Sequence, residues 1–398
     1  MSDATTPGPN ASAPLTRRPP FVLLASITIT GILANTMVSA PLPDILDDFG
    51  KGDGAAGLVI AAASLPGIVI APLIGLLADR YGRRTILVPC LLVFGLGGIL
   101  GGLAPTYGLL IVARLLQGFG SAGLINLANI LIGDHWDGVD RSRMYGYNSA
   151  VLTVSLAVLP GIGGLLTDLG SWRWAFAPYP LAFVTAVFVM RTLEPGVVDR
   201  SRSPRDQLRE AVVVVRRRAV LNPVVLSLVT FVLVFGLMLT VLPVHLEQQF
   251  GLSASQRGLV LSAPAIGATV GALLLGRIRR GVQPHAIAVL SFVLFAAAYP
   301  VLGLAGVIAV VVGATVVVGF GEGLVLPTLT DLVAGSASER DRGAVLSVQT
   351  SAIRTGQSIG PLLGGVAMAY MASSTVFVVG GILAAVIAMA TVGGRRGR

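Results

Sequence analysis

The chain has 398 residues, of which 54% are hydrophobic and only 12% are charged. A typical soluble domain carries roughly 25% charged residues, and a soluble protein of this size could not enclose so much apolar surface in one core. The composition therefore indicates a membrane protein. The net charge of +9 would suit a nucleic-acid partner, but the positions of the charges along the chain exclude that interpretation.

Twelve stretches are long and apolar enough to cross a bilayer as helices, which takes roughly 20 residues each. Continuous runs of Leu, Val, Ala and Gly favour helices, and the period-two alternation that a membrane-spanning barrel requires is absent. We therefore expect an all-α membrane protein with twelve transmembrane helices, near residues 21–42, 56–77, 85–103, 108–132, 144–166, 174–192, 221–246, 257–276, 285–304, 306–331, 343–370 and 374–392.

The polar segments divide the chain. Residues 1–20 are rich in Pro, Ser and Thr and lack an apolar core, which favours a disordered cytoplasmic tail over a signal peptide. Residues 195–219 form the one long polar stretch and predict a basic cytoplasmic linker. The linker separates an N-terminal six-helix bundle at 21–194 from a C-terminal bundle at 220–398.

The basic residues predict the orientation. If the amino terminus is cytoplasmic, all but five of the 28 Lys and Arg fall on the cytoplasmic side. Lys51, Arg173 and Arg257 then face outward, and Arg114 and Arg354 lie within helices. Because cytoplasmic loops carry an excess of Lys and Arg, we expect both termini inside, in a bacterial cytoplasmic membrane.

The two bundles are internal repeats. A shift of 201 positions aligns them without a gap over fifty residues: Gly118-Phe-Gly120 falls on Gly319-Phe-Gly321, and Pro160 falls on Pro361. Parallel repeats of six helices place a substrate site between the halves near the middle of the membrane.

One loop is dense in charge and glycine, Gly75-Leu-Leu-Ala-Asp-Arg-Tyr-Gly-Arg-Arg-Thr85. It resembles the signature loop of the major facilitator superfamily, with the matching positions Gly75, Asp79, Arg80, Gly82, Arg83 and Arg84. The resemblance implies a conformational switch in which Asp79 accepts hydrogen bonds from the start of helix 11 near Gly343 and Arg83 pairs with Asp134. The alternative is a basic loop that only sets topology. In the second half Arg280 occupies the place of Asp79, so the switch is expected in the first half.

Helix 4 carries Arg114-Leu-Leu-Gln-Gly, which resembles the second motif of the same superfamily. A guanidinium in a membrane is costly unless it is paired or faces water. We expect Arg114 to face the cavity, where it tunes a carboxylic acid or binds substrate, with Gln117 and Ser121 on the same helix face. Extension of the long side chain toward the membrane surface is the alternative.

Glu322 in helix 10 and Arg354 in helix 11 are charges without counterparts in the first half, where Ser121 and Thr153 stand. Their similar depth predicts an ion pair. Because burial raises the pKa of a carboxyl group and a nearby arginine lowers it, separating the two would couple a proton to transport. The alternative is a permanent pair that fixes helix register.

Helix 5 resembles the antiporter motif of the superfamily in Pro160, Gly163 and Gly164 only, whereas helix 11 has the fuller pattern Gly356, Gly360, Pro361, Gly364 and Gly365. Small residues allow helices 2 and 11, or 5 and 8, to approach closely across the interface between the halves. The motif is associated with proton-coupled efflux, and packing alone is the alternative.

Uncharged polar residues within the helices predict the cavity wall: Asn35, Thr36, Asn126, Asn129, Asn148, Gln349 and Gln357. Asp44 is expected in a solvated outer loop, and Asp331 is expected to pair with Arg277 or Arg280. Cys90 is alone and no cluster of His, Asp and Glu suggests a metal. No glycine-rich loop ends in Lys-Ser or Lys-Thr, so we expect no nucleotide cofactor and a proton gradient as the energy source.

The resemblance covers residues 20–392 and implies a monomeric transporter in the lipid bilayer rather than an enzyme. We expect proton-coupled efflux of small amphipathic or drug-like molecules, similar to twelve-span bacterial drug:proton antiporters. Two alternatives are uptake of a small nutrient or organic anion on the same fold and a non-transporting membrane receptor.

Overall fold

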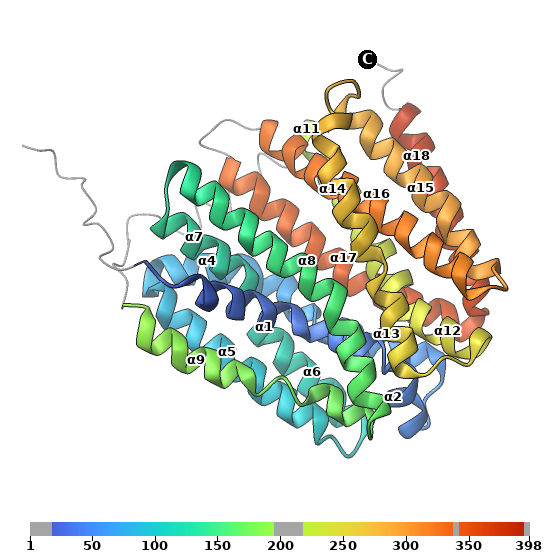
Figure 1. The fold of residues 1–398 in the computed structure, drawn as a ribbon, viewed down its shortest axis with the longest axis horizontal. Coiled ribbons are helices and arrows are strands. Elements are labelled where there is room, and N and C mark those ends of the chain that lie inside the picture. Colours follow the sequence, from blue (N-terminus) through green and yellow to red (C-terminus); the bar gives the residue numbers. More distant parts are fainter. Residues whose placement is uncertain (1–17, 195–217, 337–341, 394–398) are drawn as a thin grey trace, which may run out of the picture.

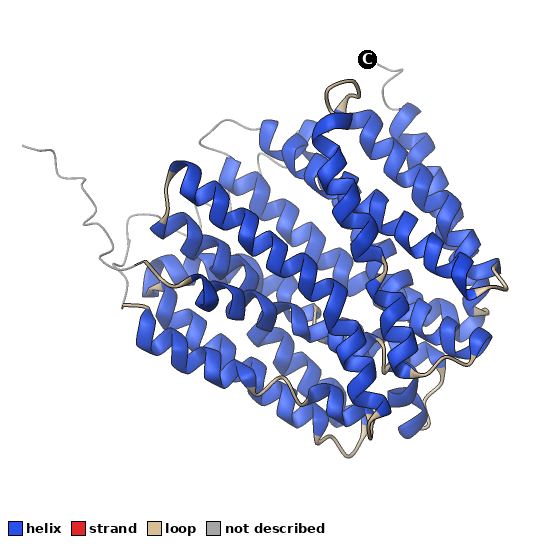
Figure 2. Ribbon diagram, in the orientation of Figure 1, coloured by secondary structure: helices blue, strands red, loops and turns tan. Residues whose placement is uncertain are grey.

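In the computed structural model the described residues, 18–194, 218–336 and 342–393, form helices joined by short loops and no strands (Figure 2). Most of the predicted tail and linker lie outside them. The N-terminal half contains α1 (Phe21–Ser39), α2 (Leu42–Asp48), η1 (Asp53–Ala55), α3 (Ala56–Ala62), α4 (Leu65–Tyr81), α5 (Arg83–Gly102), α6 (Tyr107–Ser121), α7 (Leu124–His135), α8 (Gly138–Asp168), η2 (Trp172–Phe176) and α9 (Leu181–Thr192).

The C-terminal half contains α11 (Arg218–Leu233), the π-helical segment η3 (Val234–Val241), α12 (Leu242–Phe250), α13 (Ala254–Ser262), α14 (Pro264–Ile278), α15 (Pro284–Leu304), α16 (Ile308–Gly335), α17 (Arg342–Tyr370) and α18 (Ser373–Gly393). The two halves lie side by side, blue to green and yellow to red in Figure 1. By length and composition, eleven described stretches could cross a membrane. The remaining predicted span, 343–370, is α17, whose Ser, Thr, Gln and Arg side chains make it less apolar.

Several predicted helices are interrupted. The second span breaks between α3 and α4, where Pro66 stands in the first turn of α4, and the eighth breaks between α13 and α14, where Pro264 begins α14. Proline lacks the N–H group that continues a helix and restricts the residue before it. The seventh span contains η3, where Thr240 Oγ1 donates to Phe235 O at 3.0 Å, five residues back. These breaks bend the helices at the interface between the halves.

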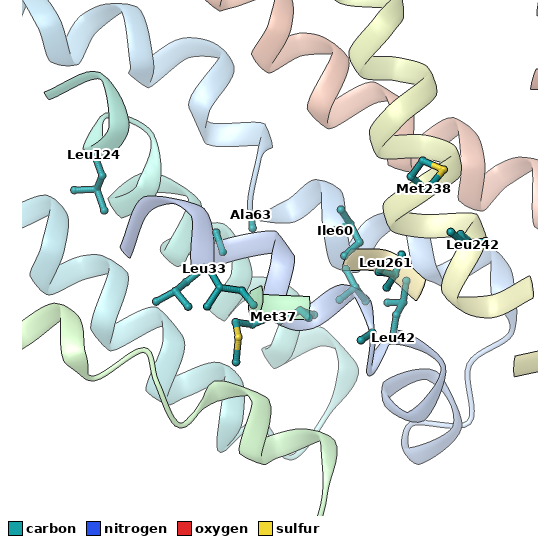
Figure 3. Packing of buried hydrophobic residues seen from close by; sticks show 14 of the residues in the cluster. Leu33, Met37, Leu42, Ile60, Ala63, Leu124, Met238, Leu242 and Leu261 are labelled. Carbon is teal, nitrogen blue, oxygen red and sulfur yellow. The ribbon is translucent and has the colours of Figure 1, made fainter. Parts of the chain in front are cut away.

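The hydrophobic core is continuous across the two halves. Leu33 and Met37 of α1 and Ile60 of α3 belong to the same buried cluster as Met238 of η3 and Leu261 of α13 (Figure 3). Each half also has an aromatic cluster of its own: Phe94 stacks on Tyr179 at 5.4 Å, and the repeat-related Phe295 lies 5.9 Å from Tyr299. The interface between the halves is therefore a packed surface rather than a loose contact.

Backbone contacts at glycines make that interface symmetric, and Gly164 of the predicted antiporter motif is among these glycines. A Cβ added at Gly258 of α13 would lie 2.4 Å from Pro160 O of α8, and a Cβ at the repeat-related Gly57 would lie 2.1 Å from Pro361 O of α17. A Cβ at Gly164 would likewise lie 2.1 Å from Ala254 O. Backbones this close require glycine. Helices 5 and 8 and helices 2 and 11 thus approach across the interface, as predicted.

Candidate functional site

The bundle has two ends, the Asp44 end and the Asp79 end. The Asp44 end is where α1 passes into α2, and it also holds α12 and α13, at the lower right of Figure 1. The Asp79 end is where α4 passes into α5 through Gly82, whose φ of 90° lies in the region that favours glycine.

Arg257 of α13 joins the two halves at the Asp44 end. Its side chain is 2% exposed, and its guanidinium donates to Asp44 Oδ2 and, at 3.0 Å, to Ala40 O, both in the N-terminal half. It also donates to Leu252 O at 3.3 Å and lies 3.9 Å from a Glu247 carboxylate oxygen in its own half. The prediction that Asp44 lies in a solvated loop is wrong, because Arg257, 213 residues away in sequence, folds against it.

Two further polar contacts link the halves at this end. Asp168, at the end of α8, accepts hydrogen bonds from the Ser255 backbone N–H at 3.0 Å, the Ala254 N–H at 3.1 Å and the Ser253 hydroxyl at 2.8 Å. It thereby satisfies the unpaired N–H groups at the start of α13. Gln248 of α12 donates to Asp53 at 2.7 Å. The Asp44 end is therefore tied together by both charge and hydrogen bonds.

The pKa values of Asp44 and Asp48, two carboxyl groups at the Asp44 end, are shifted in opposite directions. Burial raises the pKa of Asp44 above its usual value, and Arg257 opposes that rise. Hydrogen bonds from Arg173, at 2.8 Å, and from Trp172, at 3.0 Å, lower the pKa of Asp48. Asp48 pairs within the N-terminal half, whereas Asp44 pairs across the interface.

At the Asp79 end the described ion pairs each lie within one half. Arg83 donates to Asp79 and, at 2.9 Å, to Asp134 of α7, so the predicted pairing of Arg83 with Asp134 is present. In the second half Asp331 pairs with Arg279, not with Arg277 or Arg280 as predicted, because α14 ends at Ile278 and the following turn orients Arg279 toward α16.

The remaining members of the predicted switch loop are placed less completely. The predicted contact of Asp79 near Gly343 falls on a segment whose side chains lie outside the described residues, as do the surroundings of Gly75. Arg84 donates to Leu193 O at 3.3 Å, and Arg80 lies over the Tyr81 ring. The loop is thus anchored to α7 and to the end of α9.

Arg114 is enclosed inside the N-terminal half and is 0% exposed. Its guanidinium donates to Val59 O at 3.1 Å, to Ala34 O, to Gln117 Oε1 at 2.6 Å and to Asn35 Oδ1 at 2.9 Å. Four neutral oxygen atoms surround it, and the described residues bring no carboxylate to it. The guanidinium neither faces a cavity, as predicted, nor extends to the membrane surface, because it is fully enclosed. Its partner Asn35 in turn donates to Ser64 at 2.9 Å.

Several residues predicted for the cavity wall instead tie helices together inside each half. Asn148 of α8 donates to Asn129 of α7 at 3.0 Å and accepts from Thr28 of α1 at 2.7 Å. Gln349 of α17 donates to Thr330 of α16 at 3.3 Å and to Ser227 of α11 at 3.1 Å. Asn148 and Asn129 correspond to Gln349 and Thr330 under the 201-residue shift, so the two ties are related by the repeat.

The other predicted wall residues divide by exposure. Thr36 and Ser121 are buried and donate to backbone oxygens of their own helices. Asn35, Asn126 and Gln357 are partly exposed and remain able to contact a ligand.

Glu322 and Arg354 do not form the predicted ion pair in this structure. Arg354 donates to Gln357 Oε1 at 3.2 Å, and its Cδ would lie 3.6 Å from a Cβ added at Gly67 of α4 in the other half. Glu322 has no hydrogen-bond partner among the described residues and interacts electrostatically with Tyr299 of α15. The prediction rests on a similar depth of the two residues, and depth alone does not determine in which direction a side chain leaves its helix.

Sequence reasoning missed three of these groups: Arg257 and Asp168 at the Asp44 end, and Tyr299 beside Glu322. The hydroxyl of Tyr299 is fully enclosed and has no partner in the described structure. Two features of the sequence single out Arg257. It directly follows the helix capping box formed by Ser253 and Gln256, and its repeat-related residue in the first half is the uncharged Ala56.

Comparison with known proteins shows the family of this chain. The model of the Major Facilitator Superfamily matches residues 22–280 and 225–396, which together cover nearly the whole chain. The chain belongs to the major facilitator superfamily. The predicted fold of two six-helix repeats is therefore confirmed, and since members of this superfamily are transporters, the prediction that the chain is not an enzyme agrees with it.

Several curated relatives of this superfamily member are named as exporters or multidrug proteins. The bacillibactin exporter of Bacillus subtilis (strain 168) is 34% identical over 165 residues, and the alignment spans 40% of each chain. Multidrug resistance protein 2 of the same organism is 24% identical over 362 residues, which is 87% of this chain and 88% of that relative. The first of these relatives is thus matched over less than half of its length.

Solved structures share the fold at low identity. A bacterial homolog to the human lysosomal transporter Spinster, in an inward-facing and occupied conformation, has a TM-score of 0.73 and 16% identity over 93% of this chain and 94% of that one. A POT family transporter in complex with 5-aminolevulinic acid has a TM-score of 0.78 and 12% identity over 94% and 95%. These similarities establish the fold alone.

Proposed function

We propose that this protein is a secondary transporter that works by alternating access and exports small amphipathic or drug-like molecules in exchange for protons. The observation that carries the proposal is the difference between the two ends of the bundle. The halves are joined at the Asp44 end by Arg257 and Asp168, whereas the described ion pairs at the Asp79 end lie within one half. A transporter closed at one end has this arrangement.

The proposed orientation places the Asp44 end outside the cell and both termini in the cytoplasm, because the basic residues gather at the other end. The structure then represents a state closed to the outside. Export as the direction rests on relatives named as exporters and multidrug proteins. The proposed membrane is the bacterial cytoplasmic membrane, and the proposed functional unit is a monomer.

Proton coupling is assigned to Glu322. It lies in the middle of α16, while the other described acidic residues lie at or near helix ends. An ionisable residue within a membrane helix is by default a functional one, and a carboxyl group without a permanent partner is free to exchange its proton. The flanking Gly321 and Gly323 pack against Phe295 of α15 and Ala268 of α14. These contacts fix the orientation of α16 at Glu322.

The test is flux of a panel of amphipathic compounds into inverted membrane vesicles under an imposed proton gradient. We expect accumulation of at least one compound by the wild type and loss of its gradient dependence in Glu322→Gln. Asp331→Asn, at the exposed end of the same helix, is the matched control and should keep the dependence. Gradient-dependent flux that survives in Glu322→Gln would refute the assignment, and no flux of any compound would favour the receptor alternative.

A second candidate is uptake of an organic anion on the same fold. The observation that favours it is Arg354, an arginine in the membrane interior without a carboxylate partner in the described structure.

A further inference from the structure

Arg114, Arg257 and Arg354 lie within the fold away from the Asp79 end, and their positive charges have different partners. Arg257 pairs with Asp44, and Arg114 is enclosed by four neutral oxygen atoms. The described partner of Arg354 is a single neutral amide oxygen, that of Gln357. Because a charge in the membrane interior is costly unless it is paired or hydrated, Arg354 requires an explanation.

The position of Arg354 on α17 directs it toward the other half of the protein. It precedes Pro361 by seven residues, which is two helical turns, so both lie on one face of α17. That face meets the N-terminal half, where Gly57 lies against Pro361 and Gly67 lies near Arg354 Cδ. The opposite face of α17 carries the exposed Leu363 and Val366 and is suited to lipid.

The side chain of Arg354 is half-buried rather than enclosed. Part of it therefore borders open space. Pro361 marks the contact between the halves about 10 Å farther along the helix, so this space lies on the Asp79 side of the closed end.

The charges of the membrane interior indicate which kind of ligand would bind beside Arg354. Arg354 contributes a positive charge beside this space, whereas Arg114 is enclosed away from it, and Glu322 is the one acidic side chain that the described helices place at mid-span. Glu322 does not pair with either arginine. An anionic group of a ligand would supply the missing counter-charge, and the planar guanidinium matches a carboxylate, sulfonate or phosphate through two parallel hydrogen bonds.

We propose that Arg354, assisted by the amide of Gln357, is the anchor for an anionic group of the substrate. This inference rests on the proposed function, because it concerns the ligand carried between the two halves. It narrows the substrate class to small amphipathic molecules that carry a carboxylate, sulfonate or phosphate. An anionic lipid headgroup has the same chemistry and is distinguished in the experiment.

The test measures equilibrium binding of two probes that differ by one charge, dansylglycine and its neutral amide, dansylglycinamide. The purified full chain in phosphatidylcholine nanodiscs is used in equilibrium dialysis. We expect the wild type to bind the anion roughly 10-fold or more tightly than the amide. Arg354→Gln should bind both equally. The matched control Arg277→Gln makes the same substitution at an exposed arginine and should keep the preference.

Arg354→Lys keeps the charge and loses the fork of parallel donors, so it should retain a reduced preference and remains informative if Arg354→Gln does not fold. Equal binding of the two probes by the wild type, no binding of dansylglycine, or an undiminished preference in Arg354→Gln would each overturn the proposal. Loss of dansylglycine binding in nanodiscs that contain phosphatidylglycerol would assign Arg354 to a lipid headgroup and overturn the substrate assignment.

Equilibrium binding needs no gradient, so it separates this inference from the proposed function. An intact anion preference without gradient-driven flux would fault proton-coupled transport. Gradient-driven flux without an anion preference would fault the role of Arg354.

Discussion

At the scale of single residues, the arginines of this chain do three kinds of work. Arg257 links the halves through Asp44, Arg83 links α5 to α7 through Asp134, and Arg114 braces the interior of one half through neutral oxygens. Their sequence neighbours do not reveal these roles, since Asp44, Asp134 and Asn35 lie dozens to hundreds of residues from their arginines. The sequence predicts the Asp134 partner of Arg83 only because the loop resembles that of a known family.

The switch loop leads to a prediction about Asp79. Its side chain is 49% exposed, so its pair with Arg83 contributes little to stability. We expect Asp79→Asn to fold normally and to lower the transport rate about tenfold, the usual size of coupling between conformational states. Fluorescence-detected size exclusion and vesicle flux measure the two effects.

Asp137→Asn is the matched control for Asp79→Asn, because Asp137 lies exposed at the same end and its side chain makes no capping hydrogen bond. Wild-type flux in Asp79→Asn, or an equal loss in Asp137→Asn, would argue that the loop only sets topology.

Asp44 gives the Asp44 end a pH dependence. Burial raises its pKa above the usual 3.8, so the closed form binds a proton more readily than a form in which Asp44 meets water. Acidification through the range just above the usual value therefore stabilises the closed form through this group. Arg257 opposes the effect, and Asp168 and Asp47 add to it.

We expect the distance between spin labels placed on the two halves at the Asp44 end to shift toward the closed value between about pH 7 and about pH 4. Asp44→Asn should reduce that shift. Asp48→Asn is the control, because the pKa of Asp48 is lowered and its proton binds below this range. A shift of the same size in wild type and Asp44→Asn would exclude Asp44 as its source.

At the scale of helices, the interface between the halves depends on backbone contacts at glycine. Gly258 lies against Pro160 and Gly57 lies against Pro361, and the two contacts are related by the repeat. The sequence predicted which helix pairs meet, because small residues at regular spacing indicate close packing. It did not predict the breaks between α3 and α4 or between α13 and α14, which bring those glycines into place.

Gly258→Ala should weaken the closed Asp44 end, because the new Cβ would lie 2.4 Å from a backbone oxygen. Overpacking of this kind costs about 1–3 kcal/mol, so the open form should become more populated. Accessibility of a cysteine introduced beside Gly161 to a membrane-impermeant thiol reagent would report the change.

Gly313→Ala is the control, since nothing lies within 4 Å of a Cβ at Gly313. Labelling that is unchanged in Gly258→Ala, or increased equally in Gly313→Ala, would show that this contact does not hold the end closed.

At the scale of the whole molecule, the sequence predicted the fold well and the site only in part. Long apolar runs and the 201-residue repeat determine the number, order and pairing of the helices, and they do so without tertiary information. The site depends on the direction in which each side chain leaves its helix. Glu322 and Arg354 do not form the ion pair that their similar predicted depth suggests, and Asn148 and Gln349 form hydrogen bonds within their own halves.

The symmetry of the repeat is broken where function is proposed. The backbone contacts at the interface are symmetric, whereas Arg257 faces Asp44 on one side and the repeat-related positions hold Ala56 and His245. Glu322 and Arg354 likewise occur in one half only. This combination suits a transporter in which two similar halves rock against each other. The unequal charges would then determine which ligand or proton shifts the equilibrium between the two conformations.

The most direct test of alternating access measures two distances in one protein. Pairs of spin labels are placed on the two halves, one pair at the Asp44 end and one at the Asp79 end, and both distances are followed by pulsed electron resonance as pH and ligand are changed. Alternating access predicts opposite changes, with one end widening as the other narrows, and proton coupling through Glu322 predicts a diminished response to pH in Glu322→Gln. Distances that widen together, or that do not change under any condition, would contradict alternating access.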